Sequence, residues 1–220
     1  MNTPNWLLTS DGQDHHISGT AVLLPGNRPR IETIAHSLAQ INRFTGHAAR
    51  PYSVAEHSLL VCDIMAGLGF DCHAQRAALM HDAHEAFTGD VATPIKAALG
   101  VDWLGFENLH ARMVRQAFGL QCAHVAYGKH IKHADLVALA TERRDLMRFD
   151  AARNLPWPVI DTPGAMVKPL DTVDLHSPVR VAKSWRHHRD EFIGRFIALS
   201  ARCTHSADAL EMTIPTAFSA

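Results

Sequence analysis

The chain has 220 residues, of which 47% are hydrophobic and 20% charged, a composition typical of one globular domain, with or without a small appendage. Its formal charge of −1 provides no basic excess, so nucleic acid is not expected as a partner, nor is an anionic membrane. No stretch approaches the length of about 18 apolar residues that a membrane span needs. The first residues show no basic segment followed by an apolar one, so no secretory leader is expected.

The four cysteines, Cys62, Cys72, Cys122 and Cys203, are scattered and show no C-x-x-C spacing. A chain of this size does not need disulfides, so reduced thiols and a cytoplasmic location are expected. The 16 histidines are unusual and suggest metal or acid–base chemistry. Most of them are still expected to be ordinary surface residues.

Residues 1–30 contain several glycines and prolines around short apolar runs such as "TAVLL", which predicts a small hairpin or irregular arm. The pattern then becomes helical, because apolar residues from Ile31 to Ile41 recur every three or four positions. "NRFTGHAARPY" is predicted to be a loop. Further helices are predicted from Ser53, which opens an S-x-x-E capping box, to Gly67, from Cys72 to Phe87, from Thr93–Pro94 to Gly100, from Asp102 to Gly119, and from Lys129 to Phe149.

Residues 154–176 contain four prolines and are predicted to form an ordered loop or linker. Ser177–Pro178 is predicted to open a last helix that ends near Ser200, and residues 201–220 are predicted to be a loose tail. The fold class is therefore expected to be all-α, a bundle of about six or seven helices over residues 31–200.

The segment "RAALMHDAHEAFTGDVATPIK" is dense in side chains that bind metals. His81 and Asp82 are adjacent there, and His57 and Asp135 on two other predicted helices could complete a set of two imidazoles and two carboxylates. Such mixed ligands suit one divalent ion (Mn, Co, Fe, Ni or Mg) better than a closed structural zinc site. Four ligands on an octahedral ion leave two positions for water and a substrate oxygen, as a hydrolase needs. A lone His-Asp pair is more often no site at all.

These residues resemble the HD-domain metal-dependent phosphohydrolases, with His57 in "VAEHSLL", His81–Asp82 in "LMHDAHE" and Asp135 in "IKHADLVAL". "INRFTGHAARPYSVAEHS" together with "HDAHEAFTGDVATPIK" resembles more closely the branch of 5′-deoxynucleotidases and dNTP phosphohydrolases. The resemblance covers residues 31–150 and is weak outside them. It implies an HD-type helical fold, metal ligation by these four residues, a deoxynucleotide substrate, and a homodimer or higher homo-oligomer.

The same resemblance implies roles for six further residues. Glu85, four residues after His81 and hence expected on the same helix face, and Asp90 in "TGD" match catalytic acids. The residues that match substrate-binding positions are Arg43 and Lys96 for phosphate, Phe44 for the sugar, and His84 as a proton donor or phosphate contact. The alternatives are a solvated carboxylate at a helix end, a cap between helices, surface charges and a buried loop aromatic. His84 departs from relatives that have a small residue there.

The resemblance therefore implies a metal-dependent hydrolase that acts on deoxynucleoside monophosphates. A triphosphohydrolase that releases triphosphate from a dNTP is the alternative, and a nucleotide-sensing module without turnover is a third reading. His110, His124, His130 and His133 do not have the spacing of a dinuclear site, so one metal ion is expected. The near-neutral charge is a poor fit to a nuclease.

Overall fold

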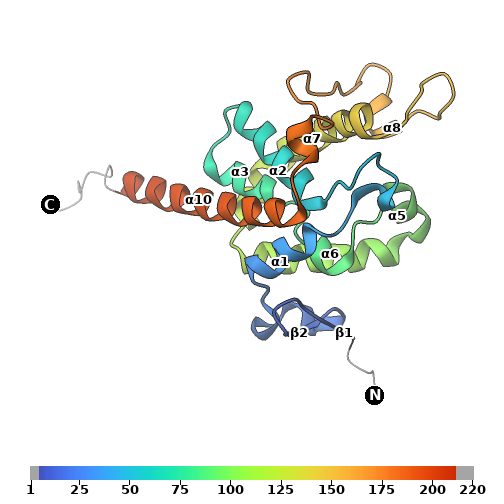
Figure 1. Cartoon of the computed structure of the whole chain (residues 1–220). Helices are drawn as coiled ribbons and strands as arrows, with labels where there is room; N and C mark the ends of the chain where they lie inside the picture. The colour runs from blue at the N-terminus through green and yellow to red at the C-terminus, as the bar shows by residue number, and fades with distance from the viewer. Residues whose placement is uncertain (1–4, 212–220) are drawn as a thin grey trace.

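The computed structural model describes residues 5–211, with side chains up to residue 204, and it confirms the all-α fold with a small N-terminal hairpin (Figure 1). The elements of this part of the chain are β1 (Trp6–Leu8), β2 (Asp14–His16), η1 (Gly19–Leu23), η2 (Pro25–Asn27), α1 (Ile31–Leu38), η3 (Arg43–Gly46), α2 (Val54–Gly67), α3 (Cys72–Leu79), α4 (Glu85–Thr88), α5 (Thr93–Leu99), α6 (Val101–Ala117), α7 (Gln121–Leu146), α8 (Pro158–Asp161), α9 (Pro178–Val181) and α10 (Trp185–Glu211). Three of these helices, α4, α8 and α9, are single turns of four residues. Within the described range, no helix is both long and apolar enough to cross a membrane.

The N-terminal arm is an antiparallel hairpin followed by two 3-10 turns, and it lies against α1 and α6 (Figure 1). The buried side chain of Asn27 holds the arm together. Its Oδ1 accepts the backbone N–H of His16 (2.7 Å), and its Nδ2 donates to the His16 carbonyl (2.9 Å) and the Val22 carbonyl (3.2 Å). One amide side chain thus supplies the hydrogen bonds that a longer sheet would otherwise provide.

The central helix is α2, which begins where the capping box predicts. Ser53 is its N-cap and accepts the backbone N–H of Glu56 (3.2 Å). Almost every side chain from Val54 to Met65 is buried, because two apolar clusters lie on opposite sides of the helix. One cluster joins α2 and α3 to α1, α6 and α10, and the other joins them to α7 and to Leu175 in the long loop. A helix buried all round is expected at the centre of a bundle.

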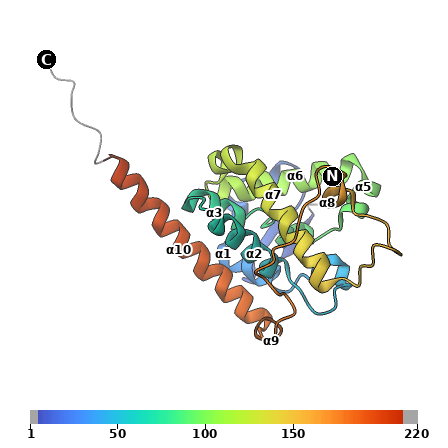
Figure 2. The ribbon, with the colours of Figure 1, turned by 90° about the horizontal axis from the view of Figure 1, so that it is seen from above.

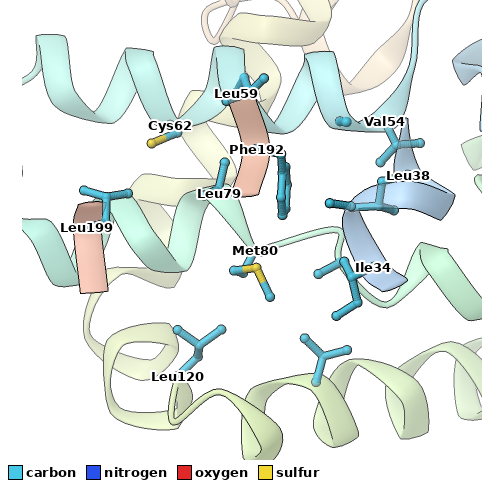
Figure 3. Close-up of a cluster of buried hydrophobic side chains, with 14 of the residues drawn as sticks. Ile34, Leu38, Val54, Leu59, Cys62, Leu79, Met80, Leu120, Phe192 and Leu199 are labelled. Carbon is cyan, nitrogen blue, oxygen red and sulfur yellow. The ribbon is translucent and has the colours of Figure 1, made fainter. Parts of the chain in front are cut away.

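The helix α10 crosses α1, α2 and α3 on one side of the molecule, and its C-terminal end projects beyond them (Figure 2). Phe192 and Leu199 of α10 enter the cluster formed by Leu59, Leu79 and Leu38 from the three crossed helices (Figure 3). The predicted opening at Ser177–Pro178 gives only the single turn α9. The prediction of a loose tail from residue 201 is wrong as far as Glu211, since α10 continues to that residue. Residues 212–220 lie outside the described part.

The predicted helix from Cys72 to Phe87 is wrong in its middle. The helix α3 ends at Leu79, and Met80 leaves helical geometry with φ −98° and ψ 8°. The chain then turns through i→i−3 hydrogen bonds, from Ala83 to Met80 (3.2 Å) and from Glu85 to Asp82 (2.9 Å), before α4 begins. The other helices differ less: α7 begins at Gln121 instead of Lys129 and ends at Leu146 instead of Phe149.

We expect Phe192→Ala to lower the free energy of unfolding by about 3–5 kcal/mol, because it leaves a cavity where α10 meets three other helices. Ile197→Ala on the same helix is the matched control, since Ile197 is 59% exposed and its loss should change stability by only about 0.5 kcal/mol. Urea unfolding of both variants tests this. Equal effects would mean that α10 does not belong to the cooperative core.

Candidate metal centre

The predicted ligands His57, His81, Asp82 and Asp135 come together between α2, the turn after α3, and α7. The two histidine Nε2 atoms lie 3.3 Å apart. Asp135 Oδ1 is 3.2 Å from His57 Nε2, and Asp82 Oδ2 is 3.1 Å from His81 Nε2. Donor atoms from three separate segments thus lie close together, as a metal centre requires, and Asp82 lies beside the two histidines. The group His57, His81 and Asp135 satisfies the geometry of a set that could hold a metal ion.

Each histidine is oriented by a hydrogen bond at its other ring nitrogen. His57 Nδ1–H donates to Glu142 Oε1 (2.6 Å), and His81 Nδ1–H donates to the Ala78 carbonyl (2.7 Å). With Nδ1 engaged in this way, each ring turns its Nε2 toward the centre, where that atom could bind a metal ion. Metal-binding histidines in proteins are oriented by this kind of contact.

Glu142 is the residue that sequence reasoning missed, and it is fully buried. It lies two helical turns after Asp135 on α7, so the spacing of seven residues on one helix face is the signal that could have revealed it. One carboxylate oxygen accepts from His57, and the other accepts from Arg43 Nη2 (3.1 Å) and Nε (3.3 Å). Glu142 therefore joins α7 to α2 and to the loop that carries Arg43.

The carboxylates make the centre favourable for positive charge. Burial and Arg43 lower the pKa of His57, but Glu142 and Asp135 raise it by more. The pKa therefore lies above its ordinary value, at about 9. Burial by itself would raise the pKa of Asp82, yet His81 and His57 hold it well below its ordinary value. The donor set thus stabilises a cation at its centre, and in this respect it fits a divalent ion.

Arg43 lies at the edge of the centre, but its fork of donors is engaged by Glu142. Only Nη1 faces the ligands, 3.9 Å from Asp82 Oδ2. In this conformation Nε and Nη2 already donate to a buried carboxylate, so they are not available to a ligand at the centre. The loop is tied to the start of α2 by hydrogen bonds from Arg43 N to the Tyr52 carbonyl (2.8 Å) and from Val54 N to the Ile41 carbonyl (3.0 Å).

Phe44 follows in an unusual backbone conformation. Phe44 (φ 57°) and Thr45 (φ 53°) are both left-handed although neither is glycine. This backbone conformation is rare for residues other than glycine, and it is found most often in functional loops. The Phe44 ring lies 6.1 Å from the ring of Trp157, between centroids, and Arg43 Cζ lies 5.4 Å from the Phe44 ring centroid. The sequence gives no signal for Trp157, which comes from the proline-rich loop.

The break after α3 directs Glu85 toward a second group of polar side chains. Glu85 is buried, and burial together with Asp82 and Asp90 raises its pKa well above the ordinary value. Its Oε2 has no hydrogen-bond partner among the described residues, and its Oε1 is 3.8 Å from Lys96 Nζ. The helix-face argument made from the sequence is wrong here, because His81 lies in the turn between α3 and α4 and does not share a continuous helix with Glu85.

The remaining predicted residues surround Glu85. Lys96 Nζ pairs with Glu107, and His84 Nε2 lies 3.5 Å from the same Glu107 carboxylate. The donor atoms of His84, Glu85 and Glu107 are close enough to hold an ion, but the ammonium of Lys96 already lies against two of them. Asp90 is half-buried, and burial raises its pKa although Arg43 lowers it. Glu107 is a further residue that sequence reasoning missed.

We expect Glu142→Gln to lower the free energy of unfolding by about 3–5 kcal/mol, because it leaves the buried guanidinium of Arg43 without its counter-charge. A double-mutant cycle uses Glu142→Leu, Arg43→Leu and the two changes together. The double variant should lose much less unfolding free energy than the sum of the two single variants, since it removes both charges together. Denaturant unfolding of the full cycle measures the coupling. Additive effects would contradict the role of Glu142 as the residue that holds this centre together.

No protein-family model matches the chain. It is 39% identical over 131 residues to the uncharacterized protein YfdR of Escherichia coli (strain K12), a match that covers 60% of this chain and 67% of YfdR. It is 37% identical over 170 residues to the uncharacterized protein RCAP_rcc00048 of Rhodobacter capsulatus, covering 72% of this chain and 83% of that protein. The chain therefore belongs to the same family as RCAP_rcc00048 and YfdR.

Proposed function

We propose that this protein is a divalent-metal-dependent phosphohydrolase of the HD-domain type that acts on deoxynucleotides, with deoxynucleoside 5′-monophosphates as its substrates. The observation that carries the proposal is the convergence of His57, His81, Asp82 and Asp135, with the two Nε2 atoms 3.3 Å apart. These four residues would hold the ion. A divalent ion at such a position acidifies water and polarises a phosphoryl oxygen.

Glu85 is the residue of this chain best suited to move a proton. It is buried beside Asp82, its pKa is raised by burial and by that neighbour, and one carboxylate oxygen is free of hydrogen bonds within the described structure. A carboxylate with these properties can accept a proton from an attacking water and later give it to the leaving oxygen. Lys96, 3.8 Å away, keeps the ionised form accessible.

Arg43 is proposed to bind the substrate with one donor. Its Nη1 is the group that faces the centre, so it would contact a single phosphate oxygen while Nε and Nη2 stay with Glu142. Phe44 and Trp157 provide two half-buried aromatic rings next to this guanidinium, a surface that suits the sugar and base of a nucleoside. His84 and Lys96 lie on the other side of Glu85, where they would offset phosphate charge in exchange for their present contacts with Glu107.

Product analysis tests the reaction. Metal-stripped protein is supplied in turn with Mn²⁺, Co²⁺, Fe²⁺, Ni²⁺ and Mg²⁺ and incubated with each dNMP, each dNTP and the matching ribonucleotides. Release of inorganic phosphate from the dNMPs is expected. Release of triphosphate from dNTPs would identify the alternative reaction, and nucleotide binding without any product would identify a sensing module. The expected homo-oligomer stays a prediction, which the mass of the protein in solution tests.

Asp135→Asn should lose bound metal and hydrolysis together, because it replaces a charged ligand with a weak neutral one. Asp190→Asn, on the surface of α10, is the matched control and should keep both. Metal content by elemental analysis and initial rates are measured on the same samples. Full metal content in Asp135→Asn would remove this residue from the ligand set.

Glu85→Gln separates proton transfer from metal binding. The amide keeps the size of the side chain but cannot accept a proton, so turnover should fall by about 10²–10⁴-fold while metal content stays unchanged. Glu32→Gln, an exposed glutamate on α1, is the control. Near-normal turnover in a metal-loaded Glu85→Gln variant would exclude Glu85 from the mechanism.

A further inference from the structure

Cys72, His73 and Cys203 meet where α3 begins and α10 passes over it, at the opposite end of α3 from the candidate metal centre. The two sulfur atoms and a ring nitrogen of His73 all lie within 4.8 Å of one another. Both cysteines are buried and are free thiols, whereas His73 is exposed to solvent. Because α3 is eight residues long, its two ends are separated by about 12 Å, so this cluster is distinct from the centre at His81.

The spacing of the three donor atoms suits a small tetrahedral ion. Zinc binds thiolates at about 2.3 Å and imidazoles at about 2.0–2.1 Å, which places neighbouring donor atoms about 3.5–3.8 Å apart. The donors of this cluster are within reach of that spacing, and the exposed ring of His73 is free to rotate toward the two sulfurs. Three protein ligands leave one position for water or a small thiol on the solvent side.

The ligands of the Cys72–His73–Cys203 cluster favour a different kind of metal ion from those of the centre at His57. Thiolates are soft ligands and favour Zn²⁺ or Cu⁺ over Mg²⁺ or Mn²⁺. Two thiolates cancel the charge of Zn²⁺, so the complex would be neutral in a buried position. The alternative for two neighbouring thiols is a disulfide, but a disulfide would leave the imidazole of His73 without a part in the cluster.

Arg76 provides an independent observation. It lies one turn after Cys72 on the same face of α3, and its charge lowers the pKa of the Cys203 thiol, although burial and the neighbouring Cys72 raise that pKa to about 12. Its Nε is buried and has no hydrogen-bond partner among the described residues. A buried cation beside two sulfur atoms favours their anionic form, which metal binding requires.

We propose that Cys72, His73 and Cys203 form a binding site for a thiophilic metal ion, with Zn²⁺ as the reference ion, that ties α10 to the start of α3. The site would act on the fold: it joins the half of α10 beyond Leu199 to the central helices, in addition to the apolar contacts of the core. It does not rest on the proposed hydrolase activity and uses none of the residues assigned to it.

Cobalt is the probe, because thiolate-bound Co²⁺ has a charge-transfer absorption that a site of imidazoles and carboxylates lacks. The full chain, reduced and stripped of metal, is titrated with Co²⁺. The thiolate band is expected to saturate at about one ion per chain. Cys203→Ser should abolish the band, and His73→Ala, an exposed change that leaves the core intact, should weaken Co²⁺ binding at least about tenfold. Cys62→Ser, also buried and also beside α10, should keep the band.

Thermal unfolding separates this site from the candidate centre. In a His57→Ala background, Zn²⁺ should still raise Tm by several degrees, and in His57→Ala/Cys203→Ser it should not. The proposal is overturned if wild-type protein shows no thiolate band, if the band survives Cys203→Ser, or if mass spectrometry of the protein purified without reductant finds Cys72 and Cys203 joined in a disulfide that Zn²⁺ does not prevent. Loss of hydrolysis without loss of the band would bear only on the centre at His57.

Discussion

The buried carboxylate of Glu142, which accepts hydrogen bonds from His57 and Arg43, is the group on which the arrangement of the centre depends. Glu142 lies on α7, and one of its oxygens accepts the hydrogen bond that orients His57 on α2. The other oxygen accepts from Arg43 in the loop before α2. A buried charge is tolerated only when its neighbours compensate it, and Arg43 and the His57 N–H do so here. Because three segments meet at one side chain, the positions of the imidazole and the guanidinium are not independent of one another.

This arrangement explains why α2 carries polar side chains at the core of the molecule. Glu56, His57 and Ser58 are buried in the middle of an otherwise apolar bundle. Glu56 receives two hydrogen bonds from Arg50 (2.8 and 2.7 Å), and Arg50 also donates to the Leu175 carbonyl. The same turn of α2 therefore anchors both the candidate centre on one side and the long loop on the other. The Glu56 and His57 side chains each have specific charged partners, which favours one packing of the helices over alternatives.

The early end of α3 has an equally specific consequence. A continuous helix through Phe87 would direct Asp82 about 100° away from His81. The turn after Leu79 instead brings both side chains into contact and places Glu85 beside Lys96, which pairs with Glu107. The Ala78 carbonyl at this helix end is the group that orients His81. Loss of regular helix thus produces the contacts on which the proposed chemistry relies.

The sequence by itself determined the all-α class, the start of α2 and the N-terminal hairpin. These features are local: apolar spacing, the Ser53 cap and clusters of glycine and proline act over a few residues. The convergence of His57, His81, Asp82 and Asp135 was also predicted from the sequence, by residue type and order and by resemblance. Only the tertiary structure decided which groups lie around them, because Glu142, Glu107 and Trp157 have ordinary sequence contexts.

The ends of the helices were also determined by the tertiary structure. Nothing in the alanine-rich run before His81 stops a helix, yet α3, which packs against α2, α7 and α10, ends at Leu79. The continuation of α10 to Glu211 and the meeting of Cys72 with Cys203 likewise depend on contacts between segments far apart in the chain. Local propensity is too weak to determine such features, since the free energy of burial between distant segments outweighs it.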